Sequence, residues 1–243
     1  MNVDLQLALD CLRFSQLAYT SATISDAATS TELIIGGRLS DPETLVIAFR
    51  GSKEPRDYIY DARFIIKNAW PGQPAAKVHR GFDEGFWSVA GETKTKVRGA
   101  RRIVCTGHSL GGDRAMECAL HLKNCGFPVT DVITFGAARV GNAAFRDYYN
   151  SVLGNQTLRF EAQGDPVPWM PLLLNGYRHP GRAVYLKNDG SAEIDPPLVD
   201  HLPAFVHTLL PQSQNLPAHF IGVFKPHFIE NYERLFAQLK EAA

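Results

Sequence analysis

The pentapeptide Gly-His-Ser-Leu-Gly at positions 107–111 is the segment whose residue types and spacing point most directly to chemistry. Glycine on both sides of Ser109 weakens any strand or helix by roughly 0.5–1 kcal/mol per residue relative to alanine. The G-x-S-x-G pattern supplies a reason, because a strand that turns sharply into a helix exposes a serine hydroxyl at a strained corner. Side chains at Gly107 and Gly111 would collide across so tight a turn. The alternative is a loop serine between two flexible glycines, and the pentapeptide alone leaves both interpretations open.

A serine hydroxyl becomes a good nucleophile only beside a base whose tautomer a third group holds. In enzymes with this motif the acid and then the histidine follow the serine along the chain. Asp165, in "EAQGDPVPWMP", follows a predicted strand and precedes a proline that restricts its backbone. We therefore predict Asp165 as the acid, with a turn-forming role as the alternative. The other acids considered are Asp131, Asp147, Asp189 and Asp195, which fall at a strand start, on a polar helix face or in a turn-rich segment.

Several histidines follow Asp165 and are candidates for the base: His179, His201, His207, His219 and His227. His227 adjoins Pro226, a residue type favoured at helix starts, just before an amphipathic C-terminal segment. A base at a helix entry is held rigidly, so position favours His227, with His219 as its competitor. No histidine falls in an H-E-x-x-H or comparable spacing, so we predict no metal and no other cofactor.

Strand-like and helix-like segments alternate along the chain. The expected strands are 31–37, 44–51, 101–107, 129–136, 157–164 and 183–186, and the expected helices are 5–12, 82–97, 110–124, 143–153 and 228–239. This alternation predicts a largely parallel, doubly wound α/β sheet, in which chemistry gathers at the carboxyl ends of strands. Ser52, Ser109 and Asp165 all fall at such ends. The proline-rich stretch 196–226 is either a wall around the site or a surface excursion.

The length and the charge balance of the chain limit its domain count and its possible partners. The chain has 243 residues and neither linker nor repeat, which predicts one domain over 1–243. Its 25 Lys and Arg balance its 25 Asp and Glu without a basic run, which argues against nucleic acid as a partner.

No segment reaches 18 uninterrupted apolar residues, and the N-terminus reads as an amphipathic helix rather than a signal peptide. Cys118 and Cys125 lie too far apart on one predicted helix to bridge. Free buried thiols suit a reducing compartment, so we expect a cytoplasmic protein. Export by a non-cleaved route, or with a signal already removed, is the alternative.

Several motifs together resemble the class 3 lipases, the fungal triacylglycerol lipases and their bacterial relatives, over roughly residues 10–240. The motifs, in order, are "VIAFRGS", "SKEPRDYIYDARF", "VHRGF", "TGHSLGG", "TFGAARVGN", "GDPVPWMP", "GYRHPG" and "HFIENYERLF". Each is weak by itself, whereas their order and spacing are highly specific. The chain is expected to be a bacterial-type member.

The resemblance implies an α/β-hydrolase fold with a lid near 53–66. It also implies Ser109 as nucleophile, Asp165 as acid and His227 as base. The oxyanion hole would use the backbone N–H of Leu110 and the N–H and hydroxyl of Ser52. Tyr58 stands where relatives of this family often carry a lid tryptophan. Asp113 replaces a small residue, and an acid is tolerated there because the first turn of a helix favours negative charge.

The expected activity is hydrolysis of acylglycerols or similar fatty acyl esters through an acyl-enzyme, with transient contact with a lipid interface. Apolar residues flanking the catalytic loops are predicted to form an acyl groove, although each is also a core candidate: Tyr58, Ile59, Trp169, Met170 and Leu172, with Leu173 beside them. The alternatives are a feruloyl-type or short-chain esterase, a phospholipase, and a lipase-like protein that binds without turnover. Chain-length preference and oligomeric state are not indicated by the sequence.

Overall fold

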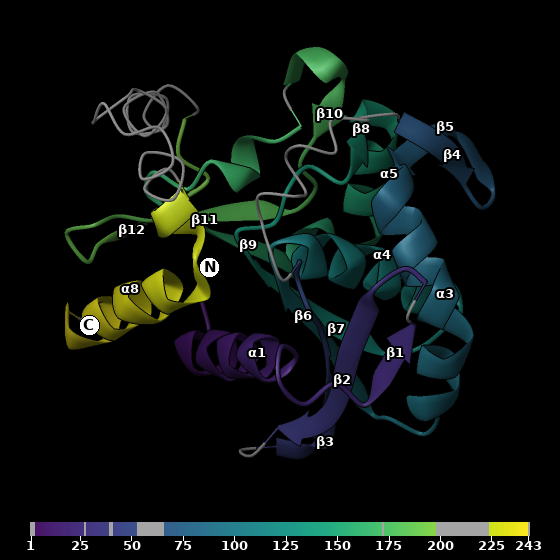
Figure 1. The fold of residues 1–243 in the computed structure, drawn as a ribbon, viewed down its shortest axis with the longest axis horizontal. Coiled ribbons are helices and arrows are strands. Elements are labelled where there is room, and N and C mark those ends of the chain that lie inside the picture. Colours follow the sequence, from purple (N-terminus) through teal and green to yellow (C-terminus); the bar gives the residue numbers. More distant parts are fainter. Residues whose placement is uncertain are drawn as a thin grey trace.

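The computed structural model describes residues 3–26, 28–38, 41–52, 66–171, 173–197 and 224–242. Its centre is an eight-stranded sheet (Figure 1). The strands in spatial order are β1 (Ile24–Asp26), β2 (Thr31–Arg38), β3 (Asp41–Phe49), β6 (Arg102–His108), β7 (Val129–Phe135), β9 (Thr157–Ala162), β11 (Arg182–Leu186) and β12 (Ala192–Ile194). The strands from β3 to β11 pair in parallel, whereas β1, β2 and β12 pair antiparallel with their neighbours.

Helices cover both faces of this sheet (Figure 1). One layer consists of α1 (Leu5–Leu17) and α8 (Ile229–Ala242), which contact each other. The opposite layer consists of α3 (Arg80–Lys96), α4 (Leu110–Asn124) and α5 (Ala143–Leu153). The chain termini therefore lie in the same layer, and the two ends of the sequence meet at one face of the sheet.

The central strands bury alternate residues against the two layers. Val46 of β3 and Val104 of β6 pack with α1 and α8. Their neighbours Ile47 and Cys105 pack with the opposite helices. Successive side chains on a strand point to opposite faces, so a strand covered on both sides is apolar throughout. This explains why runs such as "LVIAF" and "RIVC" are continuous rather than alternating.

A second, antiparallel sheet lies beyond α5 (Figure 1). It comprises β10 (Tyr177–Arg178), β8 (Gly141–Asn142), β5 (Gln73–His79) and β4 (Ile66–Trp70). The sequence did not indicate this sheet, because β8 and β10 are two residues long and leave no periodic pattern. Its β5 leads straight into α3, where the His79 side chain caps the helix by accepting the Gly81 N–H at 3.2 Å.

The predicted helices over 110–124 and 143–153 are confirmed at the same bounds, and the helix expected over 82–97 begins two residues earlier, at Arg80. The largely parallel sheet is confirmed at its centre. The antiparallel edge strands β1 and β12 were not predicted, since each is only three residues long. The expectation of a single domain over 1–243 stays a prediction.

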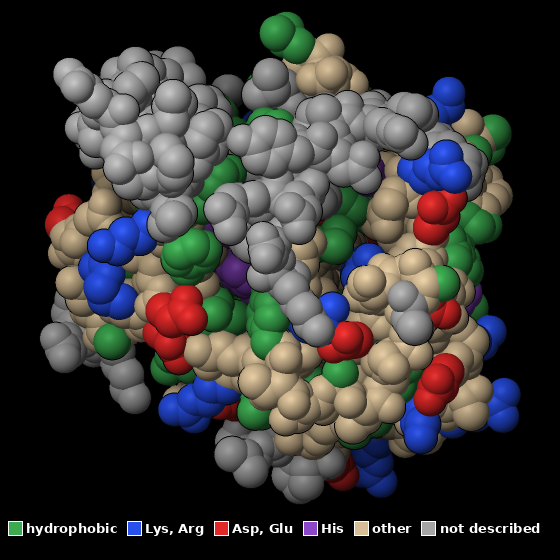
Figure 2. Space-filling view, in the orientation of Figure 1, with side chains coloured by type: hydrophobic (Ala, Val, Ile, Leu, Met, Phe, Trp, Pro, Cys, Tyr) green, Lys and Arg blue, Asp and Glu red, His purple; other side chains and the backbone are tan. Residues whose placement is uncertain are grey.

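The structure tests the predictions about surface charge, membrane-spanning segments and cysteine pairing. On the face shown in Figure 2, side chains of both charges are interspersed over the described residues. None of the helices in the described ranges is long and apolar enough to cross a membrane. All four cysteines are free thiols, which confirms that Cys118 and Cys125 do not pair, although Cys125 is exposed rather than buried.

Two carboxyl groups of α4, those of Asp113 and Glu117, are fully buried one turn apart. Burial first, and then the charge of Asp83 on α3, raises the pKa of Glu117 well above its ordinary value. Burial likewise raises the pKa of Asp113, opposed by the Ala138 backbone N–H and the charge of Arg114. Asp113 does lie in the first turn of α4, but its burial disfavours the charge that a helix-dipole interaction needs. The expected first-turn position of Asp113 is confirmed, and its burial opposes the charge there.

Replacing Glu117 by Gln is expected to stabilise the protein above about pH 5. The raised pKa means that the folded protein holds a proton which the unfolded chain releases, so stability falls as pH rises from the ordinary value of 4.5 to the folded one. We expect Glu117→Gln to exceed the native protein in free energy of unfolding by about 1 kcal/mol or more at pH 8. The difference should shrink towards pH 4.

Urea unfolding at a series of pH values measures this difference. Glu92→Gln, at an exposed position of α3, is the matched control and should leave the pH dependence unchanged. A constant difference between Glu117→Gln and the native protein at every pH would contradict the burial of an ionisable carboxyl at this position.

Candidate active site

Ser109 lies on the sharp turn between β6 and α4, with φ 57° and ψ −134°. A residue with a side chain rarely adopts this region, so the corner is strained. A Cβ at Gly107 would lie 2.3 Å from the Gly111 backbone, and one at Gly111 would lie 2.2 Å from the Phe49 carbonyl oxygen. Both glycines are thus required by close backbone approach, as the motif predicted for this turn.

The carboxylate of Asp165 lies in the loop that follows β9 and is 2% exposed. Its Oδ1 accepts the Val167 backbone N–H at 2.8 Å. Its Oδ2 lies 2.9 Å from His227 Nδ1 and accepts the Tyr232 hydroxyl at 2.7 Å. Every oxygen of this buried carboxylate is therefore hydrogen bonded, which burial of a charge requires.

Gly136 and Tyr232 complete this arrangement, and the sequence analysis assigned neither of them a role. Gly136 directly follows β7 with φ 58°, and a Cβ there would lie within 3.0 Å of Asp165, Tyr232 and His227 atoms. Tyr232 is fully buried, and burial, followed by the charge of Asp165, raises its pKa well above the ordinary value. Its hydroxyl therefore stays protonated and donates. The sequence predicts Gly136 only as the last residue of the strand over 129–136, and Tyr232 only as part of the C-terminal helix and of the motif "HFIENYERLF".

His227 ends a 3₁₀ turn, Lys225–His227, that leads to α8, and its side chain is fully buried. Its Nδ1 faces Asp165 at 2.9 Å. Its Nε2 and the Ser109 Oγ are both buried and have no hydrogen-bond partner among the described residues. The Asp–His pair is thus formed, while the Ser–His hydrogen bond is not. Such bonds are often long in a free enzyme and tighten with substrate.

His108, the residue before Ser109, connects the nucleophile turn to His227. Its Nε2 lies 2.7 Å from the His227 carbonyl oxygen and its Nδ1 lies 2.9 Å from the Tyr19 hydroxyl. A carbonyl only accepts, so Nε2 carries the proton. Burial, and then the charge of His227, lowers the pKa of His108 well below the ordinary value, so the ring is neutral and Nδ1 accepts the Tyr19 O–H. The His108 ring stacks on the His227 ring with centroids 4.7 Å apart, which positions it.

The two predicted oxyanion donors lie on either side of the nucleophile turn. Ser52 follows β3, where a Cβ on the preceding Gly51 would lie only 3.1 Å from the Ser109 Cβ. Leu110 is the first residue of α4, where backbone N–H groups have no acceptor within the helix. The role of Ser52 and Leu110 as donors stays a prediction.

The residues predicted to bind substrate separate in the structure. Trp169 lines a cavity of about 230 Å³ behind the Asp165 loop, together with Arg139, Arg159, Glu161 and His179. Charged and apolar side chains line this cavity together, and Arg139 donates to the Trp169 and Pro171 carbonyl oxygens. Burial lowers the pKa of Arg139 to about 10, against the charge of Glu161. Met170 is half-buried on the same loop, and its carbonyl oxygen accepts the Arg139 backbone N–H at 2.8 Å.

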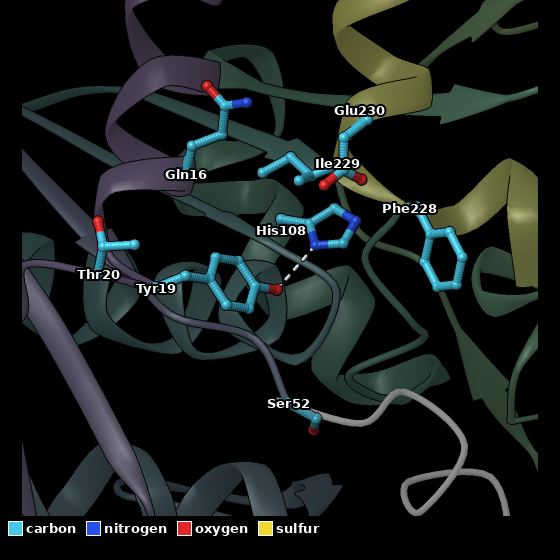
Figure 3. Close-up of a pocket in the computed structure, with 8 residues that line it drawn as sticks. All are labelled: Gln16, Tyr19, Thr20, Ser52, His108, Phe228, Ile229 and Glu230. Carbon is cyan, nitrogen blue, oxygen red and sulfur yellow. Dashed lines mark hydrogen bonds between the residues drawn. The ribbon is translucent and has the colours of Figure 1, made fainter.

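A larger cavity of about 390 Å³ opens beside His108 and Ser52 (Figure 3). Neither Trp169 nor Met170 is among its lining residues. Tyr58, Ile59, Leu172 and the rival base His219 lie outside the described residues. So does the lid predicted near 53–66, apart from its last residue, Ile66, which begins β4. Within the described ranges, no group of three or more His, Cys, Asp or Glu side chains has the arrangement of a metal site.

The sequence and fold of this chain are similar to those of known lipases. A family model described as "Lipase (class 3)" matches residues 46–175, more than half of the chain. Similar proteins include the secreted mono- and diacylglycerol lipase 1 of Fusarium solani, 33% identical over 168 residues, with 65% of this chain and 50% of that protein covered. The secreted mono- and diacylglycerol lipase A of Penicillium cyclopium is 32% identical over 189 residues, with 72% and 60% covered. The chain thus spans only half to three fifths of these relatives, which are fungal and lend the bacterial-type expectation no support.

Solved structures share the fold. The Rhizomucor miehei lipase in its propeptide complex superposes with a TM-score of 0.69 at 24% identity, covering 83% of this chain and 74% of that chain. The lipase from Rhizopus microsporus var. chinensis gives a TM-score of 0.70 at 24% identity, covering 80% and 78%. The predicted α/β-hydrolase fold is thereby confirmed.

Removing the Tyr232 hydroxyl is expected to slow turnover without unfolding the protein. Tyr232→Phe deletes one of the hydrogen bonds to Asp165, and a hydrogen bond to a charged group contributes about 1.5–3 kcal/mol. We expect kcat for a p-nitrophenyl ester to fall by roughly tenfold or more, with KM nearly constant and the pH profile of kcat displaced. Tyr148→Phe, which removes the bond from a half-buried tyrosine to Asn124, is the control. An unchanged kcat together with a lower melting temperature would show that Tyr232 only stabilises the fold.

Proposed function

Because the chain belongs to the class 3 lipase family, we propose that it hydrolyses carboxylic esters of fatty acids through a covalent acyl-enzyme. The observation that carries the proposal is the buried Asp165–His227 pair, at 2.9 Å, beside a serine on a strained strand-to-helix turn. This is the arrangement that nucleophilic acyl transfer needs, since an oriented base must take the serine proton.

In the proposed reaction His227 Nε2 takes the Ser109 proton as Oγ attacks the ester carbonyl carbon. The C–O bond to the alcohol then breaks, and the alcohol leaves with that proton. Water attacks the acyl-enzyme, gives its proton to His227, and the carboxylic acid departs as Ser109 regains its proton. Asp165 holds Nδ1 protonated throughout and stabilises the imidazolium. The neutral His108 ring, stacked on His227, avoids a second positive charge beside it.

The negative charge that develops on the carbonyl oxygen needs preorganised donors. We assign this role to the backbone N–H of Leu110 and the N–H and hydroxyl of Ser52, supported by their positions on both sides of Ser109. Losing one such donor typically slows catalysis by about 10²–10³-fold.

The proposed substrates are acylglycerols or related fatty acyl esters. Two similar proteins are named mono- and diacylglycerol lipases, which supports this class for a chain that spans part of their length. Both are also named as secreted, which supports export as the location and lends no support to the cytoplasmic expectation. Transient contact with a lipid interface belongs to the same proposal.

Hydrolysis of p-nitrophenyl esters from C2 to C16 tests the proposal. Ser109→Ala removes the nucleophile, so we expect it to lower kcat/KM by at least about 10³-fold relative to the native protein. Ser151→Ala, which changes an exposed serine of α5, is the matched control and should retain activity. Equal activity in the native protein and Ser109→Ala would contradict the mechanism.

The acyl-chain optimum then distinguishes the enzymes that share this machinery. An optimum at long chains supports a lipase, whereas an optimum at C2–C4 supports a short-chain esterase. Higher kcat/KM for a feruloyl ester or a phospholipid than for any p-nitrophenyl ester would assign the protein to those classes instead.

A further inference from the structure

The cavity of about 390 Å³ beside Ser52 and His108 has two walls from opposite ends of the chain. Figure 3 shows Gln16, Tyr19 and Thr20 on one side, and Phe228, Ile229 and Glu230 on the other. Its volume is within the range that holds small molecules and exceeds the needs of a three-carbon polyol. Nothing in the proposed acyl transfer itself uses Gln16 or Glu230.

Neither Ser109 nor His227 lines this cavity, but residues adjacent to each of them do. Phe228 directly follows His227, and His108 stacks on the His227 ring. Ser52, at the edge of the cavity, adjoins Gly51, which approaches Ser109 closely. The alcohol of an ester must lie beside His227, because it leaves with the proton that His227 delivers. The cavity is therefore where the alcohol portion of a substrate would extend.

The polar groups of the cavity indicate what that alcohol carries. Neither Gln16 nor Glu230 has a side-chain hydrogen bond or ion pair with the rest of the described chain. The Glu230 charge nevertheless acts inside the cavity, since burial first, and this charge to a lesser extent, raises the pKa of Tyr19. Glu230 is exposed in the free protein, so a bound molecule that covered its carboxylate without supplying hydrogen-bond donors would remove its hydration without compensation. An occupant that supplies hydrogen-bond donors removes this penalty.

We propose that this cavity is a subsite for an alcohol portion with free hydroxyl groups, with Glu230 and Gln16 as the residues that bind them; the inference rests on the proposed ester hydrolase function. Glu230 accepts a hydroxyl proton. The Gln16 amide both donates and accepts, which matches a hydroxyl better than a cationic ammonium group, since an ammonium only donates. Phe228 and Ile229 pack against the carbon backbone of the polyol.

Paired substrates with one acyl chain test the subsite. The ratio of kcat/KM for 1-monooctanoylglycerol to kcat/KM for methyl octanoate reports recognition of the alcohol, because the acyl group is constant. We expect Glu230→Leu to lower this ratio about tenfold, since a site built to bind a hydroxyl discriminates strongly against its loss. Glu230→Gln should lower the ratio less, and Gln16→Leu, from the opposite wall, should also lower it. Gln16→Leu keeps the test valid if Glu230→Leu does not fold.

Controls separate the subsite from other roles of Glu230. Glu230 also lies in the first turn of α8, where an acid favours the helix. Glu233→Gln, an exposed acid on the same helix, should leave the ratio unchanged, and melting temperatures report the helix effect. An unchanged ratio in all Glu230 and Gln16 variants would overturn the subsite while leaving ester hydrolysis intact. A native protein that hydrolyses no ester would overturn the proposed function and the subsite together.

A third substrate distinguishes the chemistry of the occupant. Octanoylcholine carries an ammonium group and no free hydroxyl. If Glu230→Leu lowers kcat/KM for octanoylcholine relative to methyl octanoate, and leaves the monooctanoylglycerol ratio unchanged, the cavity binds a cation and the hydroxyl assignment is wrong.

Discussion

The hydrogen bonds that converge on the Asp165 carboxylate are the constraint on which the site depends. A carboxylate that is 2% exposed is tolerated only when its oxygens are bonded, and here Val167, His227 and Tyr232 supply those bonds. They join the loop after β9 to the 3₁₀ turn and helix at the C-terminus. The orientation of His227 follows, because Nδ1 is committed to Asp165 and only Nε2 is left to exchange a proton with Ser109.

Close backbone approach is the second physical requirement, and it draws the ends of three strands together. Gly111 lets the start of α4 touch the end of β3, which brings the Ser52 segment to the nucleophile. Gly136 leaves the space at the end of β7 in which Asp165, His227 and Tyr232 meet. Parallel pairing in register places these ends at one edge of the sheet. Small residues at strand ends thus build the site as directly as the polar ones.

The two cavities near the site have different physical roles. The cavity behind the Asp165 loop contains Arg139, which donates to carbonyl oxygens of that loop, and the Arg159–Glu161 ion pair. The buried Arg139 guanidinium, bonded to the Trp169 and Pro171 carbonyl oxygens, stabilises the loop that carries Trp169. The cavity between α1 and α8 combines apolar side chains with Glu230 and Gln16, and its lining includes His108 and Phe228, the neighbours in sequence of Ser109 and His227.

The sequence by itself indicated the central strands and the main helices, and it singled out Ser109, Asp165 and His227 as the candidate nucleophile, acid and base. Continuous apolar strands indicated a sheet covered on both faces, and the glycines around Ser109 indicated a turn that excludes side chains. The spacing placed Asp165 and His227 at the ends of elements. Only the tertiary structure decided that His227 contacts Asp165 and that Tyr232 and Gly136 complete the pair. It also decided that Glu117 is buried with no hydrogen-bond partner among the described residues, and that Trp169 lines the smaller cavity and not the larger one. The physical reason is that periodicity and turn chemistry depend on neighbouring residues. Burial and hydrogen bonding depend instead on segments such as α1 and α8, which lie more than 200 residues apart in the sequence and pack side by side in the fold.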